Sequence, residues 1–304
     1  MSETLKKSFG QHLLKNPGIV SVLVDKARIR PSDTVLEIGP GSGNLTLKLL
    51  ERSKRVVAIE TDKKIASDLL KRVGQRRQKL QLVIGDAIEV DFPEFDLCVA
   101  NTPYQISSPL TFKLLKCRFR AAVLMFQREF ALRLCASVGD SYYCRLSVSV
   151  QIRANVQHVM KVSKKSFRPP PKVESSIVRI EPKREQPNID LNEFDGLVKI
   201  CFSRKNKTIG SIFKQNAIRN LLFKRSSTTT ANLLVSPTED MEVELLEEPE
   251  LPEEESKLTP EQENALTQAL TSSQLEKERA AKMTPEDFLF LLIKFKENGI
   301  SFAA

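Results

Sequence analysis

The stretch Thr34-Val35-Leu36-Glu37-Ile38-Gly39-Pro40-Gly41-Ser42-Gly43 decides the fold of this chain. Its first half is an apolar run of strand length, and its second half is rich in glycine. Where a buried strand opens into a glycine-rich loop and then a helix, the backbone can turn tightly and approach a ligand that side chains would block. We therefore expect a ligand site at the carboxyl end of this strand.

Strand and helix patterns alternate on both sides of this stretch. Apolar runs typical of buried strands lie at 34–38, 55–60, 80–84, 95–100, 121–126, 158–162 and 175–180. Runs with helical spacing lie at 17–28, 45–51, 63–73, 108–115 and 128–136. Strands that alternate with helices indicate a mostly parallel sheet covered on both faces. The predicted fold class of residues 1–184 is therefore α/β.

The strand rhythm stops after about residue 185, following the linker 181–187. Beyond it, helical spacing is found at 190–199, 207–223 and 285–298. We predict a smaller C-terminal helical domain at 185–304. Residues 226–257 begin rich in serine and threonine and become acidic with prolines, which is typical of a flexible insertion.

Charge is distributed unevenly along the chain. Residues 239–263 hold twelve acidic residues against one lysine, so this segment carries −11 and the remainder +20, whereas the whole chain carries +9. A body this basic favours a polyanionic partner, most simply nucleic acid. A lysine-rich surface without such a partner explains the charge equally well.

The sequence excludes several other classes of protein. No run of about 18 apolar residues exists, so we expect no membrane association. The N-terminus lacks the apolar region of a secretory signal, which favours the cytosol or nucleus. Five cysteines without a C-x-x-C motif and two histidines, His12 and His158, predict free thiols and no bound metal.

Two acidic residues follow the next strands and sharpen the ligand prediction. Glu60 ends its strand about 20 residues beyond the glycines, where a carboxylate can accept both hydroxyls of a ribose. Asp86 follows Gly85 after the third strand and can accept a hydrogen bond from the adenine amino group of a cofactor. This order favours S-adenosylmethionine. A dinucleotide is the alternative, although Pro40 and the absence of a G-x-G-x-x-G spacing argue against NAD.

The tetrapeptide Asn101-Thr102-Pro103-Tyr104 follows the fourth strand and suggests the reaction. The amino nitrogen of adenine is a poor nucleophile because its lone pair is delocalised into the ring. Two hydrogen-bond acceptors on its hydrogens help, and the Asn101 side chain and the backbone carbonyl of Thr102 or Pro103 can supply them. The Tyr104 ring can stack on the base. An isolated tetrapeptide of this kind is an ordinary turn, but its place beyond a cofactor loop favours methyl transfer to adenine.

Further motifs lie outside the segments described so far. They are found at 9–14 (FGQHLL), 125–134 (MFQREFALRL), 143–147 (YCRLS), 167–176 (FRPPPKVESS) and 204–208 (RKNKT). Together with 37–43 (EIGPGSG), 60, 85–86 and 101–104, they resemble the motifs of the ribosomal RNA adenine N6-dimethyltransferases over nearly the whole chain. The pattern is most like that of the eukaryotic small-subunit (18S) rRNA enzymes. One departure is Thr102, where the family usually has an aliphatic residue.

The resemblance implies a Rossmann-like methyltransferase domain that uses S-adenosyl-L-methionine, followed by the helical domain. It implies N6,N6-dimethylation of two adjacent adenines near the 3′ end of 18S rRNA during ribosome biogenesis. The expected partners are this rRNA and the pre-ribosomal particle, and the expected state is a monomer in the nucleus or nucleolus, with the cytoplasm as an alternative. Two other functions stay open: a pre-ribosome assembly and processing factor whose binding matters more than methylation, and a DNA adenine or protein glutamine methyltransferase.

The resemblance also assigns roles to individual residues. His12 and Leu14 would line the cofactor pocket, and Gly39 and Gly41 would hold the amino-acid end of the cofactor. Asn101 would lie between cofactor and target, with Pro103 and Tyr104 completing the catalytic turn. Glu60 would bind the ribose and Asp86 the adenine of the cofactor. Our candidate phosphate contacts are Arg168, Lys172, Arg204, Lys205 and Lys207.

Overall fold

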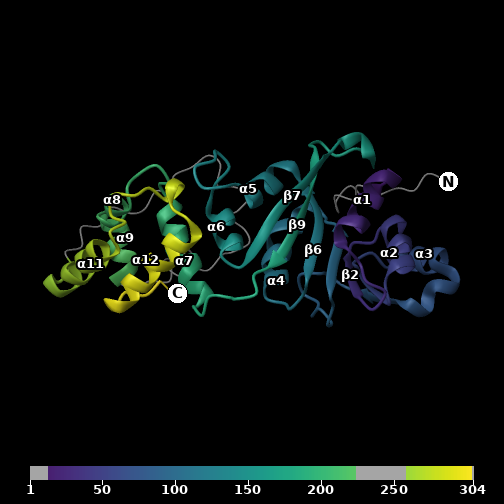
Figure 1. Cartoon of the computed structure of the whole chain (residues 1–304), viewed down its shortest axis with the longest axis horizontal. Helices are drawn as coiled ribbons and strands as arrows, with labels where there is room; N and C mark the ends of the chain where they lie inside the picture. Colours follow the sequence, from purple (N-terminus) through teal and green to yellow (C-terminus); the bar gives the residue numbers. More distant parts are fainter. Residues whose placement is uncertain (1–12, 224–257, 303–304) are drawn as a thin grey trace. The chain divides into compact units, whose positions relative to one another are not determined.

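The computed structural model describes residues 13–223 and 258–302 (Figure 1). The chain divides into two compact units, one formed by Met1–Cys135 and Ala154–Arg184, the other by Ala136–Arg153 and Glu185–Ala304. The sequence placed 136–153 in the first domain. These residues instead belong to the second unit, where the Tyr143 hydroxyl donates to the carbonyl oxygen of Met283 at 2.8 Å. The expected insertion at 226–257 lies outside the described residues.

Within the described residues, a seven-stranded sheet forms the centre of the first unit, with the strand order β4-β3-β2-β5-β6-β9-β7. The five strands from β4 to β6 are mutually parallel, whereas β9 is antiparallel to both of its neighbours. The α/β prediction is confirmed. The strands are β2 (Thr34–Ile38), β3 (Arg55–Glu60), β4 (Leu80–Ile84), β5 (Leu97–Asn101), β6 (Ala121–Gln127), β7 (Ala154–Val162) and β9 (Ser175–Pro182).

The central strands β2, β3, β5 and β6 are buried on both faces, as a parallel sheet covered by helices requires, whereas the edge strands β4 and β7 are partly exposed. Val35 and Val99 pack in one core with Leu23 and Leu49 of the covering helices. Leu36 and Cys98, the neighbours of these two valines in the strands, are also fully buried. The helices of this unit are α1 (Pro17–Ala27), α2 (Asn44–Arg52), α3 (Lys63–Val73), α4 (Ser107–Leu115) and α5 (Arg128–Cys135).

A second, two-stranded sheet was not predicted from the sequence. It pairs β1 (Leu13–Leu14) with β8 (Phe167–Arg168) in antiparallel register. The backbone nitrogen of Lys15 extends this pairing by donating to the carbonyl oxygen of Ser166 at 3.0 Å. Each strand has only two residues, too few for a periodic pattern, so only the long-range pairing defines them.

The second unit is helical. The predicted helix at 207–223 is broken into α8 (Ile209–Phe213) and α9 (Asn216–Phe223). In one straight helix, Phe213 and Ile218 would lie about 140° apart around the axis, so the break allows both to be buried. The other helices described are α6 (Arg145–Gln151), α7 (Leu191–Phe202), α11 (Pro260–Ser273) and α12 (Pro285–Glu297), of which the sequence missed α6 and α11.

Aromatic rings in tilted and edge-to-face contact and a buried carboxylate complete the core of the second unit. The Phe295 ring centroid lies 4.7 Å from that of Phe213 and 5.2 Å from that of Phe302. Glu193 accepts hydrogen bonds from the Phe302 backbone nitrogen at 2.6 Å and the Ser301 hydroxyl at 2.7 Å. These contacts fix the C-terminal end of the described chain to α7. Across the part of the chain that the structure describes, every helix is too short or too polar to cross a membrane.

Candidate functional site

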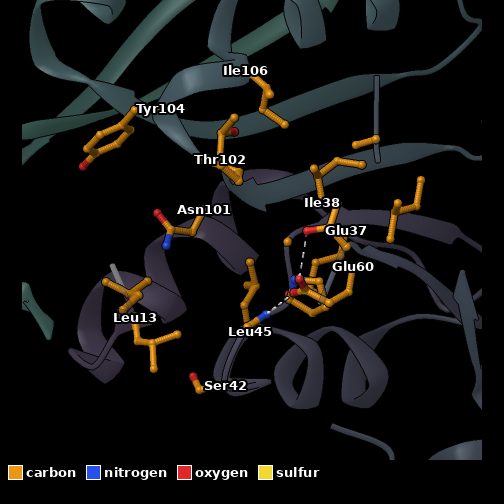
Figure 2. Close-up of a pocket in the computed structure, with 18 of the residues that line it drawn as sticks. Leu13, Glu37, Ile38, Ser42, Leu45, Glu60, Asn101, Thr102, Tyr104 and Ile106 are labelled. Atoms are coloured by element: carbon orange, nitrogen blue, oxygen red, sulfur yellow. Dashed lines mark hydrogen bonds between the residues drawn. The ribbon is translucent and has the colours of Figure 1, made fainter. Parts of the chain in front are cut away.

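The carboxyl ends of β2, β3, β4 and β5 meet along one edge of the sheet because these strands are parallel and in register. A cavity of about 270 Å³ opens at this edge (Figure 2). Its walls come from the loops that follow the four strands and from β1. Of the residues predicted for the site, it is lined by Leu14, Gly39, Gly41, Glu60, Asp86, Asn101, Pro103 and Tyr104.

The glycine loop brings backbone against the tetrapeptide. Gly39, Gly41 and Gly43 have φ values of +63°, +52° and +77°, in the left-handed region that side chains disfavour. A Cβ atom on Gly39 would lie 3.4 Å from Cγ of Pro103, so the loop already approaches that ring closely. The Gly39 nitrogen donates to the carbonyl oxygen of Ile59 at 2.9 Å, which fixes the start of the loop to β3.

Glu60 is a buried carboxylate held by backbone amides. Its Oε2 accepts a hydrogen bond from the Gly41 nitrogen at 3.3 Å, and its Oε1 accepts one from the Asp62 nitrogen at 3.1 Å. Only 5 % of Glu60 is exposed. The glycine loop and the end of β3 are therefore tied together directly at the cavity.

Asp86 begins a compact loop between β4 and β5. Its Oδ1 accepts a hydrogen bond from the Ile88 nitrogen at 2.8 Å. Lys113 of α4 stabilises this loop, because its Nζ donates hydrogen bonds to the carbonyl oxygens of Ile88 at 2.5 Å and Val90 at 2.7 Å. The same Nζ lies 4.5 Å from the centroid of the Phe92 ring. Lys113 therefore helps to position Asp86 at the cavity, a role that no sequence pattern indicates.

Glu37 is a second buried carboxylate beside the cavity, and it is 1 % exposed. Burial raises the pKa of Glu37 to about 8, and the nearby charge of Glu60 acts in the same direction. Thr46 lies close enough to oppose the shift, but among the described residues neither its hydroxyl nor Glu37 Oε2 has a partner in hydrogen-bond geometry. An unsatisfied buried carboxylate oxygen suits a cationic or hydrogen-bond-donating ligand.

The tetrapeptide turns at the end of β5. Figure 2 shows the Asn101 amide on the side of the cavity where Leu13 and Tyr104 lie. The Thr102 nitrogen donates to the Met125 carbonyl oxygen of β6 at 3.2 Å, and the Pro103 carbonyl oxygen accepts from the Ile106 nitrogen at 3.2 Å. The Tyr104 ring is half-buried, and its hydroxyl lies 2.6 Å from Oγ of Ser175. The turn is thus anchored at both ends.

The other predicted site residues lie apart from the cavity or outside the described chain. His12 falls in the residues that the structure does not describe. Arg168 and Lys172 are exposed in the first unit, at β8 and in the loop after it. Arg204, Lys205 and Lys207 are exposed in the second unit, between α7 and α8.

Sequence reasoning missed the apolar wall of the cavity. These side chains can contact the flat ring of a ligand, but each has the ordinary appearance of a core residue. Their position beside strand ends is the one signal that could have found them. They are Leu13, Ile38, Leu45, Ile59, Ala87 and Ile106. Across residues 13–223 and 258–302, no cluster of three or more His, Cys, Asp or Glu side chains could hold a metal ion.

Comparison with known proteins gives consistent matches over most of the chain. The model of the family "Ribosomal RNA adenine dimethylase" matches residues 2–243. A probable dimethyladenosine transferase of Dictyostelium discoideum is 50% identical over 302 residues, which is 98% of this chain and 91% of the relative. The dimethyladenosine transferase of Saccharomyces cerevisiae is 47% identical over 300 residues, 97% of this chain and 89% of the relative.

Two solved structures also match this chain over most of its length. The crystal structure of a dimethyladenosine transferase from Plasmodium falciparum matches with a TM-score of 0.80 and 41% identity, covering 96% of this chain and 100% of the other. The 23S rRNA methyltransferase ErmE matches with a TM-score of 0.62 and 23% identity, covering 93% of this chain and 99% of the other. The latter likeness shows a shared fold.

Replacing Lys113 by methionine keeps its apolar stem but removes two hydrogen bonds to the loop that carries Asp86. We expect affinity for S-adenosylhomocysteine, a probe of the predicted cofactor site, to fall about 5- to 30-fold, from a loss of about 1–2 kcal/mol. Isothermal titration calorimetry measures it. Lys116→Met, an exposed residue at the end of the same helix, is the control and should bind normally. Equal affinity in both variants would contradict the role of Lys113.

The raised pKa of Glu37 predicts a pH-dependent stability. Its contribution is fully present below pH 4.5, the ordinary pKa, and is lost as the pH rises through about 8. Between these values the free energy of unfolding should fall by about 1.4 kcal/mol per pH unit more in the wild type than in Glu37→Gln. Urea unfolding at three pH values from 5.5 to 7.5 measures the difference, and parallel curves for the two proteins would disprove the shift.

Proposed function

The chain belongs to the ribosomal RNA adenine dimethylase family, and we propose that it dimethylates N6 of two adjacent adenines near the 3′ end of small-subunit (18S) rRNA. It is an rRNA adenine dimethyltransferase. The two relatives described above are eukaryotic and are named dimethyladenosine transferase, which supports the small subunit as the target. We further propose S-adenosyl-L-methionine as the methyl donor.

The cavity has groups that fit this cofactor. Gly39 and Gly41 present backbone without side chains, and Glu37 Oε2 is a buried acceptor without a partner among the described residues, suited to a cationic amino group. Glu60 and Asp86 place carboxylates at successive strand ends for ribose hydroxyls and an adenine amino group. Leu14 and the apolar wall would enclose the rest. When bound, S-adenosylmethionine supplies an electrophilic methyl group carried on sulfur.

Asn101 carries the proposed chemistry on the protein side. Its side-chain oxygen would accept a hydrogen from the target amino group, which holds the nitrogen nearer tetrahedral geometry. The Pro103 carbonyl already accepts from Ile106, so the Thr102 carbonyl is the better second acceptor. Tyr104 would stack on the target base. Positioning, rather than a strong base, then provides most of the acceleration.

One observation supports this function above the others. Pro103 lies against the glycine loop, at the 3.4 Å separation from the Cβ position of Gly39 given above. The turn proposed to hold the adenine and the loop proposed to hold the cofactor therefore share one cavity. Asn101 is part of the same wall, so it can lie between the two ligands.

The Thr102 side chain departs from the usual aliphatic residue of the family but need not affect the reaction. It is 2 % exposed, and its hydroxyl has no hydrogen-bond partner among the described residues. The proposed role uses its backbone carbonyl. We therefore propose that methylation proceeds with threonine here and that the ratio of mono- to dimethyladenine is the property it can change.

We propose that exposed cations on both units contact RNA phosphates. In the first unit, Arg168 and Lys172 flank three prolines, of which Pro171 is buried and so fixes the loop. Glu174, the nearest carboxylate in sequence, pairs with Lys161 at 2.6 Å. In the second unit, Arg204, Lys205 and Lys207 would act likewise.

The proposed setting is ribosome biogenesis. We propose that the substrate is rRNA within a pre-ribosomal particle, that the enzyme acts as a monomer, and that it works in the nucleus or nucleolus, with the cytoplasm as the alternative. The exposed cations on two separate units favour a large RNA particle over a short RNA.

Asn101→Ala tests the reaction. Without the amide acceptor we expect the rate of methyl transfer to fall about 100-fold or more, while the fold and the affinity for RNA are kept. Mass mapping of dimethyladenosine in immature small subunits, incubated with enzyme and S-adenosylmethionine, measures it. Asn155→Ala, an exposed asparagine on β7, is the control. Full transfer by the Asn101 variant would refute the catalytic assignment.

The same variant separates methylation from assembly. If binding to the pre-ribosome is the essential task, Asn101→Ala rescues growth of a strain that lacks the protein. If methylation is essential, it does not. Binding to the pre-ribosome and methylation would use the same basic surfaces, so only a variant that blocks methyl transfer alone can separate them.

Arg168→Ala combined with Lys172→Ala tests the RNA surface. We expect weaker binding of a small-subunit rRNA fragment and a salt dependence shallower by about 0.7–0.9 in the slope of log K against log [salt] for each lost phosphate contact. Filter binding at several salt concentrations measures both. Lys64→Ala with Lys71→Ala on α3 removes the same charge from exposed positions and is the control. Equal slopes for the two double variants would exclude this surface.

A further inference from the structure

Tyr104 is held at its far end by a residue from another part of the sheet. It is the first residue of a short 3-10 turn, Tyr104–Ile106, directly after β5. Its hydroxyl lies 2.6 Å from Oγ of Ser175, the first residue of β9. In the sheet, β6 lies between β5 and β9. The tyrosine side chain therefore reaches past one strand to the next.

Ser175 is a rigid anchor. It is fully buried, and β9 pairs with a strand on each side, so Ser175 stands opposite Gln127 of β6 and Val162 of β7. Its hydroxyl therefore occupies a fixed point in the sheet. Burial raises the pKa of the Tyr104 hydroxyl, which keeps this group protonated and able to share a hydrogen bond with serine.

We propose that Ser175 is a positioning residue for methyl transfer: it holds the Tyr104 hydroxyl and so fixes the position of the ring on which the target adenine stacks. The inference rests on the proposed function, because it presumes that an adenine enters the cavity. A tyrosine side chain held only at its Cα can swing about the Cα–Cβ bond, which moves the whole ring. A hydrogen bond to the hydroxyl stops this swing. Rotation about Cβ–Cγ leaves the hydroxyl in place, so the bond sets where the ring lies, and the ring need not be placed again when the base arrives.

The next residue in the strand provides a matched control. Ser176 is also fully buried, and its Oγ lies 3.0 Å from Nε2 of His158. Successive residues of a strand point to opposite faces, so the Ser176 hydroxyl does not share the partner of Ser175. Ser176→Ala removes a buried serine hydrogen bond of the same kind, one residue away, without touching Tyr104.

The clamp should affect turnover more than binding. RNA would dock through its phosphates, and the cofactor through the glycine loop, neither of which uses Ser175. We therefore expect Ser175→Ala to lower kcat about tenfold, since small errors in placing reacting groups are costly. KM for immature small subunits and the affinity for S-adenosylhomocysteine should stay within about twofold of the wild type, because a phosphate-dominated interface is unchanged.

A double-mutant cycle tests the clamp. Tyr104→Phe keeps the stacking ring but removes the hydroxyl, so it should lower kcat as much as Ser175→Ala does. The variant carrying both changes should be no slower than either single variant, because one interaction has been removed from two sides. Ser176→Ala should keep the wild-type kcat. If Ser175→Ala does not fold, Tyr104→Phe still tests the same hydrogen bond.

Two results would overturn the inference: a kcat for Ser175→Ala equal to that of Ser176→Ala, or effects of the two clamp changes that multiply in the double variant. Failure of the proposed function looks different. In that case the wild-type protein transfers no methyl group to rRNA adenines. If the wild type dimethylates rRNA and both clamp variants turn over normally, the proposed function stands and the clamp alone is wrong.

Discussion

The left-handed backbone at Gly39, Gly41 and Gly43 is the constraint on which the site depends. It allows the chain to leave β2, turn within five residues and begin α2. The same turn lays backbone against Pro103 and directs the Gly41 amide to Glu60. A side chain at Gly39 or Gly41 would strain the backbone and crowd the cavity. The glycine loop, the end of β3 and the turn at 101–104 are therefore positioned together.

Burial makes the two glutamate carboxyls beside the cavity dependent on hydrogen-bond donors from the protein. Glu37 and Glu60 are both almost fully buried on neighbouring strands, and the sheet register places Glu37 opposite Ala58. Glu60 is compensated by two backbone amides, whereas Glu37 is not compensated to the same degree and has a raised pKa. Glu37 Oε2 is thus a buried oxygen without a hydrogen-bond partner among the described residues, beside the carboxylates of Glu60 and Asp86. A ligand that brings a hydrogen-bond donor or a positive charge would satisfy it.

The turn proposed to carry the chemistry is held by the sheet as well as by its own local hydrogen bonds. The Thr102 amide is bound to β6, and the Tyr104 hydroxyl is bound to β9. Lys113 stabilises the neighbouring loop in a similar way, through two carbonyl oxygens. The groups proposed to touch the ligands are therefore supported by groups outside the cavity, an arrangement that keeps the geometry of a site fixed. The cations proposed to bind RNA lie outside this supporting network, at exposed positions.

The sequence by itself determined the bounds of β2, β3, β4 and α3, the order of the cavity loops and the polar and glycine positions that line the cavity at Gly39, Glu60, Asp86 and Asn101, because hydrophobic period and glycine placement are local properties. Only the tertiary structure decided the pairing of β1 with β8, the membership of α6 in the second unit, the raised pKa of Glu37, and the partners of Lys113 and Ser175. Each of these depends on contacts between residues far apart in the chain. Ser175 and Tyr104, for example, are 71 positions apart. No local pattern records such a contact, because the energy of the interaction arises only once folding has brought both groups together.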